Sequence, residues 1–229
     1  GLNTEFNRPA FAIMDPSLAA TLPRRQVACG VTDIMMHTLE RYFNPIQGNE
    51  TTMQLAEAVL RVVIANGPAV IADAGNLDAM SEIMWCGSLS HNGLTGLGGA
   101  KGLSVHPVSF ALSEKYDIIH GEALSALWCS WARYVYRCNI NRWLQFAKNI
   151  WNMDIDFEHP EKTIEQAIDK QERYYASIGM PINLKSLGVK KESLEELALK
   201  CSRNRTRTLI GYKPLEYEDI LKIYQMAYE

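Results

Sequence analysis

Asp33 and His37 are the pair of residues in this chain whose types and spacing most clearly predict chemistry. They lie four residues apart in the segment 30–43, GVTDIMMHTLERYF, which is otherwise rich in apolar side chains. Residues at positions i and i+4 project from the same face of a helix, one turn apart. Because a carboxylate and a neutral imidazole both bind divalent metals, we interpret this pair as part of a metal site.

Two further histidines, His106 and His120, lie 14 residues apart, each at the start of a predicted helix. His106 precedes Pro107, a residue favoured in the first turn of a helix, and His120 opens an apolar helical segment. A lone histidine in such a place is more often a hydrogen-bonded polar group than a ligand. Together with the Asp/His pair, however, the two give one carboxylate and three imidazoles, a set that suits Fe²⁺ or Zn²⁺.

Other polar or glycine-rich positions give weaker indications. Gly30 lies one turn before Asp33, where a missing side chain either leaves room for a metal, substrate or cofactor or permits close helix packing. His91 either caps a helix or lies near the site, and His159 is expected to be an exposed residue at a helix start. The glycine-rich segment 93–102 contains no G-x-x-x-x-G-K-[ST] motif and no G-x-G-x-x-G after a strand, so we interpret it as a turned connection.

The composition is that of an ordinary globular protein and excludes few classes by itself. The chain has 229 residues, 47% of them hydrophobic, and a formal net charge of −3, which gives no reason to expect nucleic acid or an anionic membrane as partner. Its five cysteines form no C-x-x-C pair, which favours reduced thiols in the cytoplasm. No uninterrupted apolar run appears long enough to span a bilayer.

The elements that must position these residues are mainly helices. Residues 9–16 read as a short apolar strand stopped by Asp15-Pro16. A helix is expected from Pro23 to Phe43, and another from residue 49 or 51 to about 65, stopped by Asn66-Gly67-Pro68. The other expected helices span residues 76–90, 107–115, 121–137, 141–151, 161–177, 192–202 and 216–228. The sequence therefore predicts a mainly α fold with a short N-terminal strand.

The order of these residues resembles a known family. Asp15-Pro16, Leu22-Pro23, the segment Gly30–Asp33 with His37, then His106 and His120-Gly121 follow the pattern of the iron-containing (group III) alcohol dehydrogenases. The three spacings between the four polar residues, 4, 69 and 14, all agree with that pattern. The resemblance covers essentially the whole chain and is strongest to the butanol dehydrogenase and aldehyde reductase branch.

This resemblance implies a fold, a function and a set of roles. Residues 23–229 would form the all-helical metal-binding domain of the dehydroquinate synthase-like fold. Residues 1–22 would be the end of a nucleotide-binding domain whose other part is absent from these residues. Asp33, His37, His106 and His120 would bind the catalytic metal. The enzyme would transfer a hydride between NAD or NADP and a primary alcohol or aldehyde, as a homodimer or larger homo-oligomer, and the fragment alone would be inactive.

The resemblance also implies contacts with the cofactor. Leu18 and Leu22, in the turn after Asp15-Pro16, would approach it. Phe110 stands where many members of the family have a further histidine that meets the nicotinamide and relays protons. A phenylalanine transfers no proton, so a proton relay would have to use water or another side chain.

Two other classes of function stay open on the residues alone. A helical metal-dependent hydrolase would also use histidine and carboxylate ligands, but the chain has no His-Asp dipeptide and no second carboxylate cluster for a second metal. A non-catalytic helical assembly domain would keep the four ligands only for stability. Phosphatase activity without a response to NAD(P)H would indicate the first, and metal binding without cofactor binding would indicate the second.

Overall fold

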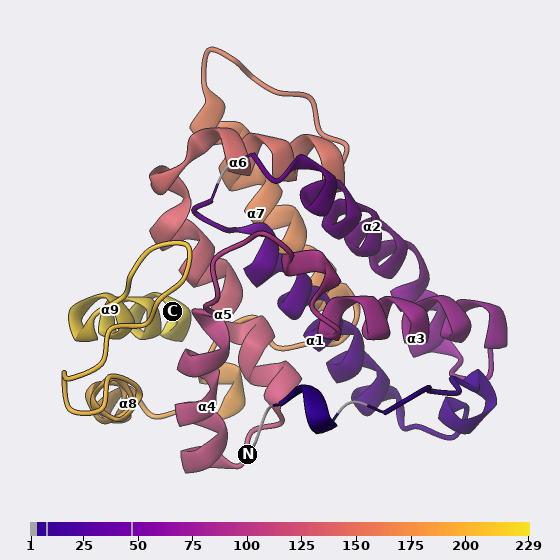
Figure 1. Ribbon diagram of the computed structural model, residues 1–229. Helices are drawn as coiled ribbons and strands as arrows, with labels where there is room; N and C mark the ends of the chain where they lie inside the picture. Colours follow the sequence, from indigo (N-terminus) through magenta and orange to yellow (C-terminus); the bar gives the residue numbers. More distant parts are fainter. Residues whose placement is uncertain (1–3, 8, 47) are drawn as a thin grey trace.

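The protein is built from helices, as Figure 1 shows for the computed structural model, which describes residues 4–7, 9–46 and 48–229. The α-helices of these residues are α1 (Arg24–Tyr42), α2 (Glu50–Ala72), α3 (Leu77–His91), α4 (Val105–Tyr116), α5 (His120–Val135), α6 (Ile140–Gln145), α7 (Pro160–Ser177), α8 (Leu194–Cys201) and α9 (Tyr217–Tyr228). Short 3-10 turns lie at η1 (Glu5–Asn7), η2 (Pro16–Ala19), η3 (Leu94–Gly96), η4 (Tyr136–Cys138), η6 (Lys185–Leu187) and η7 (Lys191–Ser193), and η5 (Phe146–Ile150) is a π-helical turn. The predicted mainly α fold is confirmed.

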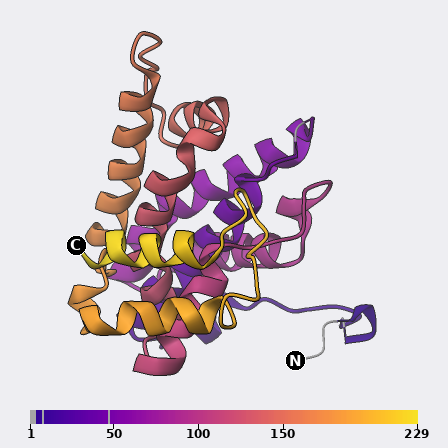
Figure 2. The same ribbon diagram turned by 90° about the vertical axis from the view of Figure 1, so that its left-hand side faces the viewer.

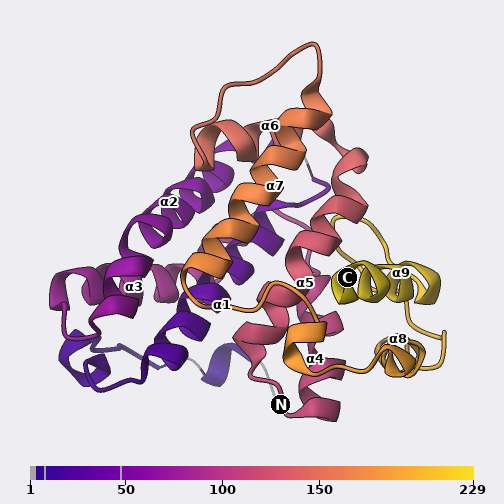
Figure 3. The same ribbon diagram turned by 180° about the vertical axis from the view of Figure 1, so that it is seen from behind.

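Helix α1 lies inside the molecule and packs against α2, α3 and α5. Val31, Met35 and Leu39 on this helix are fully buried. Helix α5 in turn packs against α4, α7 and α9, and Figure 3 shows α7 on the near side of the molecule. Because α1 and α5 are surrounded by other helices, the polar side chains that they carry are held by a rigid framework.

An aromatic cluster fills the core beyond the C-terminal end of α1. The ring of Phe43 stacks on Trp143 with centroids 3.9 Å apart and also contacts Trp128 and Trp131. All four side chains are buried. Offset and tilted aromatic contacts of this kind add to the large area of apolar surface that such rings remove from water. Trp128 and Trp131 of α5 therefore belong to the core.

Helix α2 is longer than expected, because it continues through Gly67 and Pro68 to Ala72. A proline inside a helix removes one backbone hydrogen bond and costs about 3 kcal/mol. The residues beyond it, Val70 and Ile71, are buried in the core, and Tyr174 of α7 lies directly against Gly67. The burial of this apolar face therefore outweighs the cost of Pro68, and the predicted end near residue 65 is wrong.

The same helix is the one described helix that is long and apolar enough to cross a membrane by length and composition alone. Its apolar run is interrupted by Glu57 and Arg61, in agreement with the prediction that no uninterrupted run is long enough to span a bilayer. In the structure Met53, Leu60 and Val63 pack into the core. Core helices pass the same test, so α2 is explained by its packing within this fold.

The strand expected at residues 9–16 is wrong. Residues 9–15 have no regular secondary structure, and Pro16 begins η2 after Asp15 caps it through the backbone N–H of Ser17. Phe11 and Ile13 are 78% and 84% exposed. Figure 2 shows this segment running away from the helical body. A strand needs a neighbouring strand to satisfy its backbone groups, and none of the described residues supplies one.

The other helix boundaries agree with the sequence reading to within a few residues. Asn76 caps α3 by accepting a hydrogen bond from the backbone N–H of Ala79 at 3.2 Å. The predicted helix at 141–151 is divided into α6 and the π-helical turn η5. The five cysteines are free thiols, as expected.

Candidate metal centre

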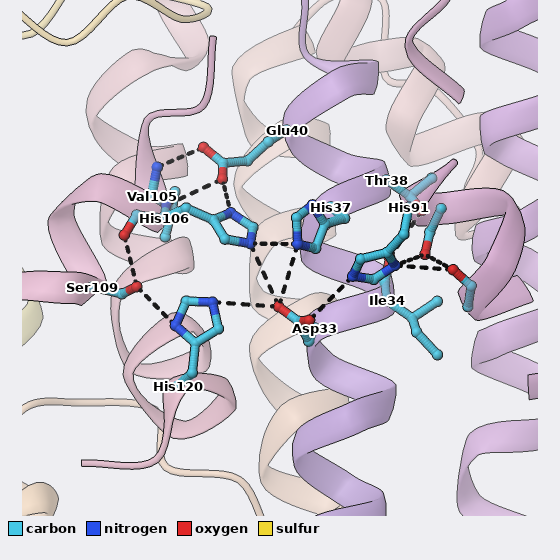
Figure 4. A network of polar contacts seen from close by, with 12 residues as sticks. Asp33, Ile34, His37, Thr38, Glu40, His91, Val105, His106, Ser109 and His120 are labelled. Carbon is cyan, nitrogen blue, oxygen red and sulfur yellow. Dashed lines mark hydrogen bonds and ion pairs between the residues drawn. The ribbon is translucent and has the colours of Figure 1, made fainter. Parts of the chain in front are cut away.

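Four polar side chains meet where α1, α4 and α5 come together (Figure 4). Asp33 and His37 come from one face of α1, His106 from the first turn of α4, and His120 from the first residue of α5. One ligand atom from each of Asp33, His37 and His106 lies within 4.8 Å of the others. The Nε2 atom of His120 is 3.5 Å from Oδ1 of Asp33. The structure thus brings together all four residues of the predicted ligand set.

Oδ1 of Asp33 lies at the centre of this group. It is buried and has no hydrogen-bond partner with acceptable geometry, although the Nε2 atoms of His106 and His37 lie 3.5 Å and 3.8 Å away. An unpaired carboxylate oxygen surrounded by imidazole nitrogens is costly to bury. A divalent cation would satisfy the oxygen and the nitrogen lone pairs together. The donor set therefore fits a bound metal.

Glu40 orients His106. Its carboxylate accepts hydrogen bonds from Nδ1 of His106 and from the backbone N–H groups of Ser104 and Val105. The glutamate side chain is 1% exposed. Because a carboxylate only accepts, the His106 proton lies on Nδ1, which leaves the Nε2 lone pair facing Asp33. This carboxylate–histidine arrangement is the one that supports metal-binding histidines.

Ser109 orients His120 as Glu40 orients His106, by a contact with Nδ1 of the ring. The hydroxyl of Ser109 donates to the backbone carbonyl of His106 at 2.8 Å, and its oxygen lies 3.3 Å from Nδ1 of His120. Since that hydroxyl proton is already used, Ser109 accepts from Nδ1–H of His120. The Nε2 lone pair of His120 is then free on the side of Asp33.

The position of His120 also depends on the glycine that follows it. A Cβ atom added to Gly121 would lie 2.7 Å from both Cα and the carbonyl oxygen of Cys29 on α1. Only glycine permits the backbones of α1 and α5 to come this close. Gly30 is different, since a Cβ there would meet nothing within 4 Å. Its missing side chain therefore leaves open space and is not explained by close packing.

The charges of the site agree with this reading. Burial lowers the pKa of His37 to about 3, with a contribution from His106, and burial also lowers the pKa of His120. Burial acts in the same direction on His106, but the neighbouring carboxylates of Asp33 and Glu40 outweigh it and raise the pKa to about 9. Against its own burial, contacts with His106 and His91 hold the pKa of Asp33 well below its usual range.

The three expected cofactor-binding residues lie in different places. Phe110 of α4 is 55% exposed and its ring stacks on that of His120 with centroids 5.3 Å apart, so it borders the site. Leu18 and Leu22 are exposed on η2 and the turn after it, a segment that packs beside α3. They lie outside the group of four polar residues.

Glu40 was not selected from the sequence, and His91 was left open between a helix cap and a place near the site. Glu40 lies one turn beyond His37 on the same face of α1, so its helical spacing was a signal that could have found it. His91, the last residue of α3, has its Nε2 atom 3.3 Å from Oδ2 of Asp33. No spacing in the sequence indicates this second contact, because it depends on how α3 packs on α1. His159, as expected, is exposed and directly precedes α7.

The glycine-rich segment forms a connection, as predicted. Gly93 and Gly98 adopt φ angles of +94° and +74°, which favour glycine. The segment borders a surface hollow of about 790 Å³ that also includes Arg41 and His91. In the part of the chain that the structure describes, the group at Asp33 is the one set of three or more side chains that meets the geometry of a metal site. A second metal site, as a two-metal hydrolase needs, is not found there.

Comparison with known proteins agrees with this geometry. Residues 27–228 match the model of the C-terminal part of the Fe-containing alcohol dehydrogenase family. The chain is 33% identical over 229 residues to NADH-dependent butanol dehydrogenase A of Clostridium acetobutylicum. This alignment covers 100% of the chain and 59% of that protein. The chain is 28% identical over 224 residues to the NADPH-dependent aldehyde reductase YqhD of Escherichia coli, covering 96% and 56%.

Solved structures show the same fold. The aldehyde reductase YqhD from E. coli superposes with a TM-score of 0.90 at 26% identity, covering 96% of this chain and 57% of that one. NADH-dependent butanol dehydrogenase A from Thermotoga maritima superposes with a TM-score of 0.87 at 26% identity, covering 94% and 55%. The chain therefore spans a little more than half the length of the relatives it matches.

Proposed function

Because this chain belongs to the Fe-containing alcohol dehydrogenase family, we propose that it carries the metal centre of an alcohol dehydrogenase or aldehyde reductase. The reaction is the reversible transfer of a hydride between NAD(P) and a primary alcohol or aldehyde. Asp33, His37, His106 and His120 hold the metal. The observation that supports this most directly is the buried, unpaired Oδ1 of Asp33 facing three imidazoles.

Each ligand residue has a separate role. Asp33 supplies the negative charge of the set, and its lowered pKa favours the ionised carboxylate. His106 and His120 present Nε2 lone pairs because Glu40 and Ser109 engage their Nδ1 atoms. A divalent ion bound by this set would act as a Lewis acid on the substrate oxygen.

Phe110 shapes the substrate side of the site. It is half exposed and covers one face of the His120 ring. An alkyl chain that packs on this ring loses contact with water, which favours alcohols and aldehydes with an apolar tail. Since Phe110 transfers no proton, the proton of the alcohol leaves through water or another side chain.

The proposal extends to the organisation of the enzyme. Residues 23–229 form the metal-binding domain, and residues 1–22 are the end of the domain that binds the nicotinamide cofactor, with Leu18 and Leu22 near it. Fe²⁺ is the metal we favour, with Zn²⁺ as the other candidate. Homo-oligomerisation, a cytoplasmic location and the choice between NAD and NADP remain predictions.

Replacing His106 by Ala in the full-length protein tests the proposal. His106→Ala removes an imidazole that Glu40 holds in place, so the variant is expected to lose both metal retention and NAD(P)-dependent turnover. Metal content measured by mass spectrometry and turnover measured by nicotinamide absorbance check the two. His159→Ala is the matched control, because His159 is exposed at the start of α7. A metal-free His106→Ala protein that keeps full turnover would overturn the assignment.

A further inference from the structure

His91 reaches Asp33 from α3 and contacts the carboxylate oxygen that the other three histidines do not face (Figure 4). Its Nε2 atom lies 3.3 Å from Oδ2 of Asp33, whereas His37, His106 and His120 all face Oδ1. The His91 ring also packs against that of His37, with centroids 4.1 Å apart. The two oxygens of one carboxylate therefore have two different environments.

The His91 ring is held in its orientation by α3. Its Nδ1 atom lies 2.7 Å from Oγ of Ser90 and 2.9 Å from the backbone carbonyl of Gly87. Ser90 is fully buried, so this end of the ring is fixed by the core of the protein. The opposite end, with Nε2, is directed at Asp33.

The direction of the His91–Asp33 hydrogen bond follows from the chemistry of the carboxylate. Oδ2 of Asp33 only accepts, so the contact requires the proton of the His91 ring on Nε2. On the other side of the ring, Nδ1 faces the carbonyl oxygen of Gly87, which only accepts, and Oγ of Ser90, which itself donates to that carbonyl at 2.9 Å. A ring with its proton on Nε2 also has no lone pair there to bind a metal.

We propose that His91 is a positioning residue for the metal centre, which rests on the proposed function above. It holds Oδ2 of Asp33 and thereby fixes the rotation of the carboxyl group, so that Oδ1 is presented to the same point as the three imidazoles. Glu40 does this for His106 and Ser109 for His120. His91 extends the same arrangement to Asp33, the one carboxylate of the ligand set. Hydrogen-bond partners of this kind, which contact a ligand and not the metal, affect the affinity for the metal.

Two substitutions of His91 in the full-length protein separate this role from others. His91→Leu fills a similar volume without a donor, and His91→Gln keeps an N–H donor at about the position of Nε2. The side chain of His91 is 44% exposed, so both variants are expected to fold, which circular dichroism checks. The probe is Co²⁺, whose affinity is measured by competition with a chromophoric chelator and whose visible absorption spectrum reports the ligand geometry.

We expect His91→Leu to lower Co²⁺ affinity by about 10-fold or more and to change the spectrum, since loss of such a partner costs about 10–100-fold. His91→Gln is expected to stay within about 3-fold of the native protein. His159→Leu, the same change at an exposed histidine, is expected to have no effect.

Three results would overturn the proposal. A His91→Leu protein with native affinity and spectrum shows that Asp33 needs no such partner. A His91→Gln protein as weak as His91→Leu shows that the imidazole itself binds the metal. If the native protein binds Co²⁺ no better than His106→Ala, the metal centre is absent, and the proposed function fails together with the role of His91.

Discussion

Glu40 connects the helix that carries Asp33 and His37 to the helix that carries His106. One buried carboxylate accepts from the His106 ring and from the backbone N–H groups at the start of α4. The first N–H groups of a helix have no partners within the helix, and a negative charge there is favourable. Glu40 therefore fixes both the start of α4 and the direction of its histidine.

Glu40→Gln is expected to weaken metal binding by roughly 10–100-fold and to lower the free energy of unfolding by about 1–3 kcal/mol. The amide of glutamine replaces one acceptor oxygen by an N–H₂ group, which faces donors of α4 and pairs with none of them. Chelator competition measures the first effect and urea unfolding the second. Glu82→Gln, on the exposed face of α3, is the control. Native metal affinity in Glu40→Gln would show that His106 needs no carboxylate partner.

The sequence was enough to select the four proposed metal ligands, Asp33, His37, His106 and His120. The i, i+4 pair on α1 follows from helical geometry, and the two later histidines follow from helix starts marked by Pro107 and Gly121. Their convergence on one point came from the family pattern and not from any local rule. The contact of His91 with Asp33 was not predicted, because it depends on how α3 packs on α1. The two residues are 58 positions apart along the chain.

At the scale of elements, the close approach of α1 and α5 at Gly121 positions His120. Gly121→Ala would press a methyl group against the backbone of Cys29, so we expect the free energy of unfolding to fall by about 1–3 kcal/mol. The shift of α5 moves His120 as well, and metal affinity is expected to fall with stability. Urea unfolding and chelator competition measure both.

Gly30→Ala is the matched control on the neighbouring helix. Gly30 lies inside α1, is exposed, and has open space where the methyl group would go. Alanine in a helix is better than glycine by about 0.5–1 kcal/mol, so this variant is expected to be slightly more stable. Equal effects of the two substitutions would contradict the role given to the α1–α5 contact.

The elements themselves were predicted with two informative errors. The stop at Pro68 was expected from local rules, but burial of Val70 and Ile71 outweighs them. The strand at residues 9–16 has the apolar pattern of a strand, yet the described chain offers no partner for it. Both errors arise because tertiary contacts, which the local sequence does not contain, decide the outcome.

At the scale of the whole molecule, metal binding and turnover are expected to separate. The 229-residue chain contains the proposed ligand set but only 59% of the length of butanol dehydrogenase A. A metal that binds only the folded chain stabilises it by about 2.7 kcal/mol at 100 times Kd, a rise in Tm of roughly 5–10 °C for this size. We expect this rise with Zn²⁺ or Fe²⁺, and no reduction of NAD⁺ or NADP⁺ by alcohols.

Thermal unfolding followed by circular dichroism measures the rise, and absorbance at the nicotinamide band measures turnover. The His106→Ala chain, which lacks one of the proposed ligands, should show no rise with either metal. Alcohol-dependent reduction of NAD(P) by the 229-residue chain would refute the proposal that the cofactor domain lies mostly outside it.

The distribution of the proposed ligands over the helices also determines how the site would adapt to ions of different radius. Asp33, His37 and Glu40 move together because they share α1, and Glu40 ties the start of α4 to the same body. His120 is attached to that body more weakly, by a 3.3 Å contact with Ser109, and its side chain is 34% exposed. We therefore expect the side chains on α1 to keep their positions when an ion of different radius binds, and the side chain of His120 to shift.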